Sequence, residues 1–377
     1  MQTSDLDYDL PADAIAQRPL EPRDSARMLV ATSRALAHET VADLHHQIEP
    51  GDVVVLNDTK VIPARLHLYK PTGGAVEVLL LERRADGTWE ALVKPSRRIA
   101  DATVLSSKPP GSHDDTVSLR VEVGPALGDG RRLVRLVHAD ARTDDDWLDR
   151  VGEVPLPPYI HEPLADPNRY QTVFAKHPGS VAAPTAGLHL TEALLQRLAD
   201  RGATIVRVEL VVGLATFRPI TVDRVEDHPM HAEHYRIPAE TIAVLERRRS
   251  DSGGPRVTAI GTTAVRAVES WAASGRAEGD TSLFIHGDYP FAVVDRLLTN
   301  FHVPRSSLLA LVQSFVGPGW RDLYEAALLE KYRFLSFGDA MLLDRGACTP
   351  SGSTAARPTS ADAARNETGH DDSLGSP

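Results

Sequence analysis

The sequence is poor in cysteine, with Cys348 as the single example among 377 residues. One thiol excludes an intramolecular disulfide and a metal site built from several cysteines. No run of about 18 apolar residues occurs, which argues against a membrane-spanning helix. The first residues, MQTSDLDYDLPADAIAQ, also lack the apolar stretch of a secretory signal. These absences predict a cytoplasmic protein without a membrane partner.

Basic residues are outnumbered, since 41 Lys and Arg face 52 Asp and Glu, a net charge of −11. Proteins that coat nucleic acids depend on phosphate neutralisation and carry a basic surface. The composition therefore argues against a nonspecific nucleic-acid coat, and DNA is not an expected partner. It leaves open an enzyme that holds one RNA through a local basic patch.

Large apolar side chains are nearly missing from residues 346–377, which predicts a disordered tail. Residues 64–150 instead contain short segments of alternating polarity and no convincing helical period. Such spacing predicts a small closed or nearly closed β-barrel. The expected strands are residues 75–81, 88–94, 116–123 and 132–138.

Strands and helices alternate on both sides of that insert, which predicts a mixed α/β domain made of residues 1–63 and 151–345. The expected strands are residues 52–57, 203–212, 256–261 and 281–286. The expected helices are 192–201 after a Thr191 cap, 262–273, 308–316 after a Ser306 or Ser307 cap, and 322–332.

A glycine-rich stretch, EVGPALGDG at residues 122–130, superficially resembles a dinucleotide-binding loop. Such a loop must lead from a strand into a helix. The next residues, RRLVRLVHA, have the pattern of another strand, so we expect a hairpin turn without a cofactor.

Two segments combine small residues with a following helix. Residues 178–189 (PGSVAAPTAGLH) include Gly187 and His189, and small side chains allow a ligand to approach the backbone. Thr262 and Thr263 open a predicted helix that carries Arg266, where free amide groups favour anions. A tight structural loop and simple helix caps are the respective alternatives.

Two further motifs contain histidine. DHPMHAEH at residues 227–234 contains His228, His231, Glu233 and His234, residue types that suit zinc or iron. Its prolines preclude a regular helix with preformed ligand pairs, so a polar substrate contact is favoured and no metal is expected. Asn300 and His302 share a face of an extended stretch, where they suit base recognition or proton transfer.

Lys94, Arg97 and Arg98 form a basic cluster that suits phosphate contact or a solvated barrel edge.

Together these segments resemble one family, the S-adenosylmethionine:tRNA ribosyltransferase-isomerases of queuosine biosynthesis. The matching stretches lie in one order between residues 7 and 343: DYDLPADAIAQRPLEPRDSARMLV, GDVVVLNDTKVIPARL, LPPYIHEP, RYQTVFAKHPGSVAAPTAGLHL, EDHPMHAEHY, AIGTTAVRAVES, VVDRLLTNFHVPRSSLLALV and EKYRFLSFGDAMLL.

The resemblance implies an α/β domain with a barrel insert and a reaction that consumes S-adenosylmethionine. Its ribosyl group is transferred to the aminomethyl group of a 7-deazaguanine at the tRNA wobble position and isomerised, and adenine and methionine leave. The expected acid–base residues are His189, His231 and His302. Gly187, Thr262, Thr263 and Arg266 are expected to bind the cosubstrate, while Asn300, His228, Lys94, Arg97 and Arg98 are expected to contact the RNA substrate.

The chain departs from the family pattern in three places, the first of which is Asp58, where Asn is usual. The usual HVGAGTF is VVGLATF at residues 211–217, which places Val211 at a histidine and Ala215 at a glycine. The usual Tyr-Pro-Gly is His286, Gly287 and Asp288. Two alternatives therefore stand beside the main hypothesis: a member that uses another amine or a free deazapurine, and a non-catalytic relative that binds RNA or nucleosides.

Overall fold

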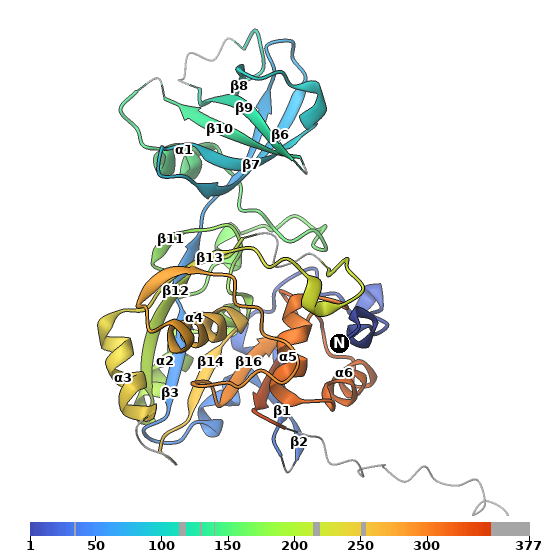
Figure 1. Ribbon diagram of the computed structural model, residues 1–377, viewed down its shortest axis with the longest axis vertical. Helices are drawn as coiled ribbons and strands as arrows, with labels where there is room; N and C mark the ends of the chain where they lie inside the picture. The colour runs from blue at the N-terminus through green and yellow to red at the C-terminus, as the bar shows by residue number, and fades with distance from the viewer. Residues whose placement is uncertain are drawn as a thin grey trace, which may run out of the picture.

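The computed structural model describes residues 1–33, 35–112, 118–128, 130–138, 140–213, 219–249 and 254–347. A β-barrel stands above a larger α/β region, and the two follow one another along the long axis of the molecule (Figure 1). Residues 348–377 of the predicted tail lie outside the described part, whereas Gly346 still bonds to Phe315 through its amide (2.8 Å).

The larger region is built on one mixed sheet with the strand order β15-β13-β12-β3-β14-β16-β17-β1-β2. Its central strands β12, β3, β14 and β16 run parallel, so their carboxyl ends meet at one edge. The strands are β1 (Arg27–Ala31), β2 (Leu36–Thr40), β3 (Val53–Asn57), β12 (Thr204–Leu210), β13 (Glu233–Arg236), β14 (Val257–Ile260), β15 (Glu278–Thr281), β16 (Arg296–Asn300) and β17 (Ala340–Asp344).

Helices cover both faces of this sheet. Side chains alternate between the two faces along each strand, and both sets are apolar in β3, so each face needs a covering layer. Val53 and Val55 of β3 pack into one core, and Val54 and Leu56 into another. The first core also holds residues of α3 (Ala239–Arg249), α4 (Thr262–Ser274), α5 (Ser307–Val316) and α6 (Trp320–Leu329), and the second holds residues of α2 (Glu192–Asp200) and the 3-10 helix η4 (Val41–Gln47).

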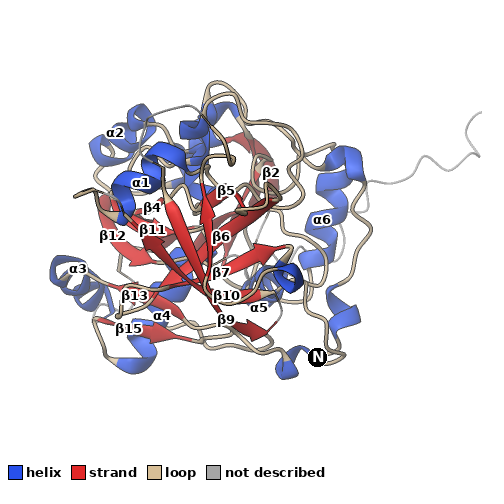
Figure 2. Ribbon diagram, turned by 90° about the horizontal axis from the view of Figure 1, so that it is seen from above, coloured by secondary structure: helices blue, strands red, loops and turns tan. Residues whose placement is uncertain are grey.

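The barrel is closed in the order β10-β7-β6-β5-β8-β9 and is seen from above in Figure 2. Its interior is apolar and includes the fully buried Trp147 of α1 (Asp144–Val151). The strands are β5 (Arg65–Tyr69), β6 (Ala75–Arg83), β7 (Trp89–Lys94), β8 (Thr103–Ser106), β9 (Arg120–Gly128) and β10 (Arg131–Val137). The predicted fold class, a mixed α/β region with a small β-barrel, is therefore confirmed.

Local sequence signals were accurate where one cap or turn decides the structure. β9 and β10 pair antiparallel, so the glycine-rich stretch belongs to a hairpin as expected. Thr191 and Ser306 cap α2 and α5 through their side chains. The predicted strand 281–286 is wrong, since β15 ends at Thr281 where its pairing with β13 ends. Among the described residues, no helix combines the length and apolarity needed to cross a membrane.

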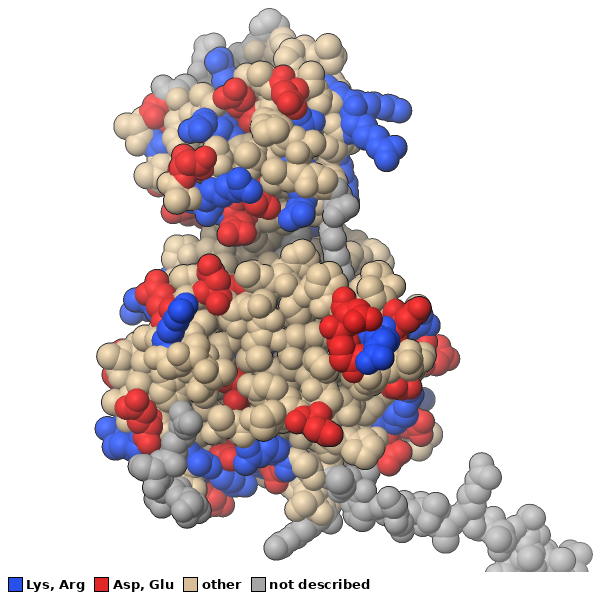
Figure 3. Space-filling model, in the orientation of Figure 1, with Lys and Arg blue, Asp and Glu red and all other residues tan. Residues whose placement is uncertain are grey.

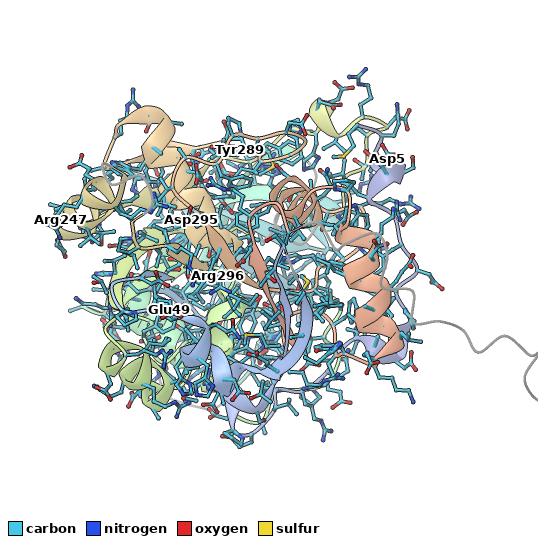
Figure 4. All side chains as sticks on the ribbon, turned by 90° about the horizontal axis from the view of Figure 1, so that it is seen from below. Asp5, Glu49, Arg247, Tyr289, Asp295 and Arg296 are labelled. Atoms are coloured by element: carbon cyan, nitrogen blue, oxygen red, sulfur yellow. The ribbon has the colours of Figure 1, made fainter. Side chains whose placement is uncertain are left out.

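The two edges of the central sheet differ. At the amino ends, the buried Arg296 donates to Asp344 (2.6 Å) and to the carbonyl of Gln47 (2.5 Å). Asp295 accepts from Arg248 (2.6 Å), and Figure 4 shows Asp295 and Arg296 close together at this edge. Ion pairs thus occupy the amino edge, while the carboxyl edge contains the pockets described next, as is usual for ligand sites in parallel sheets.

Candidate active site

A polar pocket opens where β14 and β16 end. Gly261 and Thr262 follow β14, while Asn300 ends β16 and His302 lies just beyond it. The segment that contains Thr185 forms the opposite wall. The lining residues are Ala183, Pro184, Thr185, Ala186, Val212, Gly261, Thr262, Thr263, Thr299, Asn300, His302 and Leu308.

Gly261 makes the abrupt turn from β14 into α4 possible. Its φ of 89° lies in the region that L-residues avoid, so glycine is required there. The first turn of α4 then leaves its amide groups directed towards the pocket, where the helix dipole favours an anion. Thr263 adds a buried hydroxyl that has no hydrogen-bond partner within the described structure.

The amide of Asn300 is held on both sides. Its Oδ1 accepts from the Thr185 hydroxyl (2.8 Å), and its Nδ2 donates to the carbonyl of Leu335 (3.1 Å). Asn300 therefore links the end of β16 to the 183–186 segment across the pocket wall.

The His302 side chain is buried in this pocket, with 8% of the residue exposed. Burial lowers the pKa of His302 to about 3, because the charged imidazolium is poorly solvated there. Its Nε2 lies 2.9 Å from the Thr299 hydroxyl, whereas Nδ1 has no hydrogen-bond partner among the described residues. In the tautomer whose Nε2 donates to Thr299, Nδ1 is free to accept a proton, and the lowered pKa makes it a weak base.

A second pocket shares Leu308 with the first, and we call it the apolar pocket after the run Leu283, Phe284 and Ile285 in its wall. Its lining residues are His228, Met230, His231, Glu233, Arg266, Leu283, Phe284, Ile285, Ser307, Leu308 and Leu311. Arg266 is paired with Glu233 and donates from Nε to the carbonyl of Leu283 (3.1 Å). Its buried Nη2 has no partner within the described structure, so one donor is left for a ligand.

The two histidines of the 227–234 segment differ in exposure. His228 is half-buried beside Phe284, and burial together with the neighbouring His231 lowers the pKa of His228. His231 is exposed. Alternation along β13 points Glu233 inward and His234 outward to Asp280 (3.0 Å), so the four potential ligands of this segment do not face one point.

Among the described residues, one group has the composition and spacing to hold a metal: Asp58, His177 and Glu209. His177 Nδ1 lies 3.2 Å from Asp58 and 3.4 Å from Glu209. Arg236 already pairs with Glu209, and Arg207 lies 3.9 Å from Asp58. The arrangement is that of a balanced ion-pair network at the carboxyl ends of β3 and β12.

Gly187 and His189 lie apart from the polar pocket. A side chain at Gly187 would meet Phe174 at 2.8 Å and Thr172 at 3.0 Å, so its small size serves packing. The buried His189 ring contacts the carbonyls of Ala186 (3.1 Å) and Gly338 (2.8 Å), and desolvation lowers its pKa. It borders a separate pocket with Arg23 and Arg169.

The basic cluster lies on the barrel. Lys94, Arg97 and Arg98 are exposed and form no ion pair with another described residue, and Lys70 donates to the carbonyl of Arg98 (2.8 Å). Figure 3 shows basic side chains projecting from one side of the barrel. The surface thus offers cations for a ligand despite the acidic composition.

Comparison with known proteins decides the family. A profile of the family described as queuosine biosynthesis protein matches residues 3–343. The chain belongs to this family.

Relatives in the queuosine biosynthesis family cover nearly the whole chain. The S-adenosylmethionine:tRNA ribosyltransferase-isomerase of Rubrobacter xylanophilus is 50% identical over 91% of this chain and 98% of its own. The protein of the same name from Thermus thermophilus is 48% identical over 89% and 98%. The crystal structure of S-adenosylmethionine tRNA ribosyltransferase from Thermotoga maritima has a TM-score of 0.51 at 33% identity, and covers 90% of this chain and 99% of that one.

One of the departures from the family pattern lies beside the apolar pocket. The His286 ring lies 4.7 Å from that of Phe284, which lines the pocket. The Val211 amide donates to the carbonyl of His234 (2.9 Å) and continues the pairing of β12 with β13. Ala215 lies outside the described residues. In this queuosine biosynthesis protein, His286 thus lies against Phe284, the residue of the apolar pocket that also contacts His228.

Sequence reasoning missed three residues of the site. Glu233 was considered only as a metal ligand, although it is the partner of Arg266. Thr185 and Thr299, which bond to Asn300 and His302, were not considered at all. Both threonines lie within the APTAGLH and TNFH motifs, which could have indicated them. The contact between the two motifs, however, forms only in the tertiary structure.

Proposed function

We propose that the protein is an S-adenosylmethionine:tRNA ribosyltransferase-isomerase. It transfers the ribosyl group of S-adenosylmethionine to the aminomethyl group of a 7-deazaguanine at the tRNA wobble position and isomerises it, which gives epoxyqueuosine, adenine and methionine. One observation carries the proposal: two pockets meet at Leu308 and are lined by buried donors without protein partners, on Thr263 and Arg266. The names of the relatives support the ribosyl transfer from S-adenosylmethionine to tRNA and the isomerisation.

The cosubstrate is proposed to bind at the start of α4. Amide groups of Thr262 and Thr263 and the free Nη2 of Arg266 suit its carboxylate and ribose hydroxyls. Gly187 contributes indirectly, since its close packing on Phe174 fixes the loop that forms the opposite wall. S-adenosylmethionine is consumed as a substrate, and the proposed steps require no metal.

Proton transfer is assigned to His302 and His231. A base must take a proton from the carbon beside the sulfonium, and an acid must assist the departure of adenine; each such group typically contributes 10²–10⁴-fold. His302 is assigned as the base because it lies in the polar pocket with an uncommitted Nδ1, although burial makes its imidazole a weak base, and the exposed His231 is assigned as the acid. His189 is assigned an indirect role, because both ring nitrogens contact backbone carbonyls.

The RNA substrate is proposed to contact both regions. Asn300 and His228 stand at the pockets and are assigned to the modified base. Lys94, Arg97 and Arg98 on the barrel are assigned to the tRNA backbone, with no role in binding DNA. This assignment makes residues 1–63 and 151–345 the catalytic domain, 64–150 an inserted RNA-contacting domain and 346–377 a tail, in a protein that works where tRNA is found, in the cytoplasm.

The test is release of adenine from S-adenosylmethionine in the presence of tRNA that carries the aminomethyl-deazaguanine. We expect release with this tRNA, none without it, and a loss of at least 100-fold in H302Q. The exposed His161 provides a control, since H161Q should retain full activity. Release with a free amine in place of tRNA, or no release at all, would contradict the proposal.

A further inference from the structure

The N-terminal segment reaches the polar pocket from the other end of the sequence. The Tyr8 hydroxyl donates a hydrogen bond of 2.5 Å to the carbonyl of His302, 294 residues away. The Tyr324 hydroxyl accepts from the His302 amide at 3.1 Å. His302 lies between the end of β16 and the start of α5, where no strand or helix partner serves its backbone. Both of its backbone groups are therefore satisfied by tyrosine side chains.

These tyrosines are themselves fixed. The rings of Tyr8 and Tyr324 pack edge to face with centroids 5.0 Å apart, a favourable geometry for aromatic pairs. Burial raises the pKa of both hydroxyls, so they remain protonated donors or acceptors. Arg321 holds the segment in place by donating to the carbonyls of Asp5 (2.7 Å) and Asp7 (2.6 Å), and Figure 4 shows Asp5 beside α6.

We propose that Tyr8 is a positioning residue of the active site, which acts by fixing the backbone of His302 and through it the imidazole. The inference rests on the proposed role of His302. The side chain is held at Nε2 by Thr299, and the backbone by Tyr8 and Tyr324, so three contacts define where Nδ1 points. Proton transfer depends steeply on such geometry, since a displacement of about 1 Å at a reacting group can cost roughly 100-fold.

The discriminating variant is Tyr8→Phe, which keeps the ring and removes only the hydroxyl. We expect kcat for adenine release to fall about tenfold, with KM for S-adenosylmethionine and tRNA within twofold of the parent. Tyr332→Phe is the matched control, because Tyr332 belongs to the same aromatic cluster and its hydroxyl bonds to His38 (2.8 Å) instead. It should leave kcat unchanged.

A double mutant separates positioning from general structural support. If Tyr8 acts through His302, Y8F should cause no further loss in the residual single-turnover rate of an H302Q protein. An equal tenfold loss in that background, or a Y8F rate equal to that of Y332F, would overturn the inference. Should Y8F fail to fold, as judged by thermal unfolding, Tyr324→Phe replaces it, with the same expected loss and the same two overturning results. Full activity of H302Q alone would instead overturn the proposed role of His302.

Discussion

Arg266 and Glu233 form an ion pair inside the wall of the apolar pocket, with 7% of each side chain exposed. Arg266 belongs to α4 and Glu233 to β13, so the pair joins a helix to the strand beside it. Glu233 also accepts from the Gly213 amide (3.3 Å). The guanidinium is thus held in place while its Nη2 remains available to a ligand.

Glu233→Gln should therefore lower the free energy of unfolding by about 3 kcal/mol, because it leaves a buried guanidinium without its counter-ion. Urea denaturation at pH 7 measures this. The exposed pair of Arg18 and Glu162 gives the control, since E162Q should cost less than about 1 kcal/mol. Equal losses of unfolding free energy in E233Q and E162Q would show that the buried pair adds no more stability than an exposed one.

Acid should destabilise the protein through His302. Its pKa is lowered from 6.5 to about 3 in the folded state, so between these values the unfolded chain binds a proton that the folded chain does not. Stability is then lost as the pH falls below about 6.5, by up to about 1.4 kcal/mol per pH unit from this group. In urea titrations at pH 6, 5 and 4, H302Q should show a shallower loss than the parent, whereas H161Q should match the parent. Identical slopes for H302Q and the parent would contradict the assignment.

The order of elements could be predicted from sequence mainly where one local interaction decides it. The Thr191 cap, the turn at Gly261 and the hairpin between β9 and β10 each depend on a few neighbouring residues. The strands β1 and β17 were not predicted, because they pair with each other across more than 300 residues, and β2 was missed with them because its partner in the sheet is β1.

The site was predictable only as a set of motifs. The sequence indicated Thr263, Arg266, Asn300 and His302, and parallel strands bring these residues to one edge. It gave no means to distinguish a glycine that makes room for a ligand from one that makes room for a core side chain. Gly187 is of the second kind, and its neighbour in space, Phe174, is 13 positions earlier in the sequence.

Gly187→Ala should destabilise the protein by about 1–3 kcal/mol, the usual range for overpacking a core. The added methyl would lie 2.8 Å from the Phe174 ring, closer than any relaxed contact. Phe174→Leu in the same chain should recover part of the loss in thermal unfolding by removing the ring edge. Gly213→Ala is a suitable comparison, because no heavy atom lies within 4 Å of its added carbon. A stable G187A protein with weakened cosubstrate binding would instead indicate direct ligand contact at residue 187.

Replacing Lys94, Arg97 and Arg98 with Ala should raise KM for tRNA and leave KM for S-adenosylmethionine unchanged, because the three cations lie on the barrel, away from both pockets. Each lost phosphate contact should reduce the slope of log affinity against log salt by about 1. Filter binding of tRNA between about 50 and 200 mM salt measures that slope, because affinities of phosphate-binding proteins change strongly over this range.

Arg83, Arg84 and Arg142 give a matched triple control on the same barrel, since each is already paired with a carboxylate. If both triple variants change the slope equally, net charge rather than the cluster explains RNA binding; if neither changes it, the barrel does not contact the phosphates.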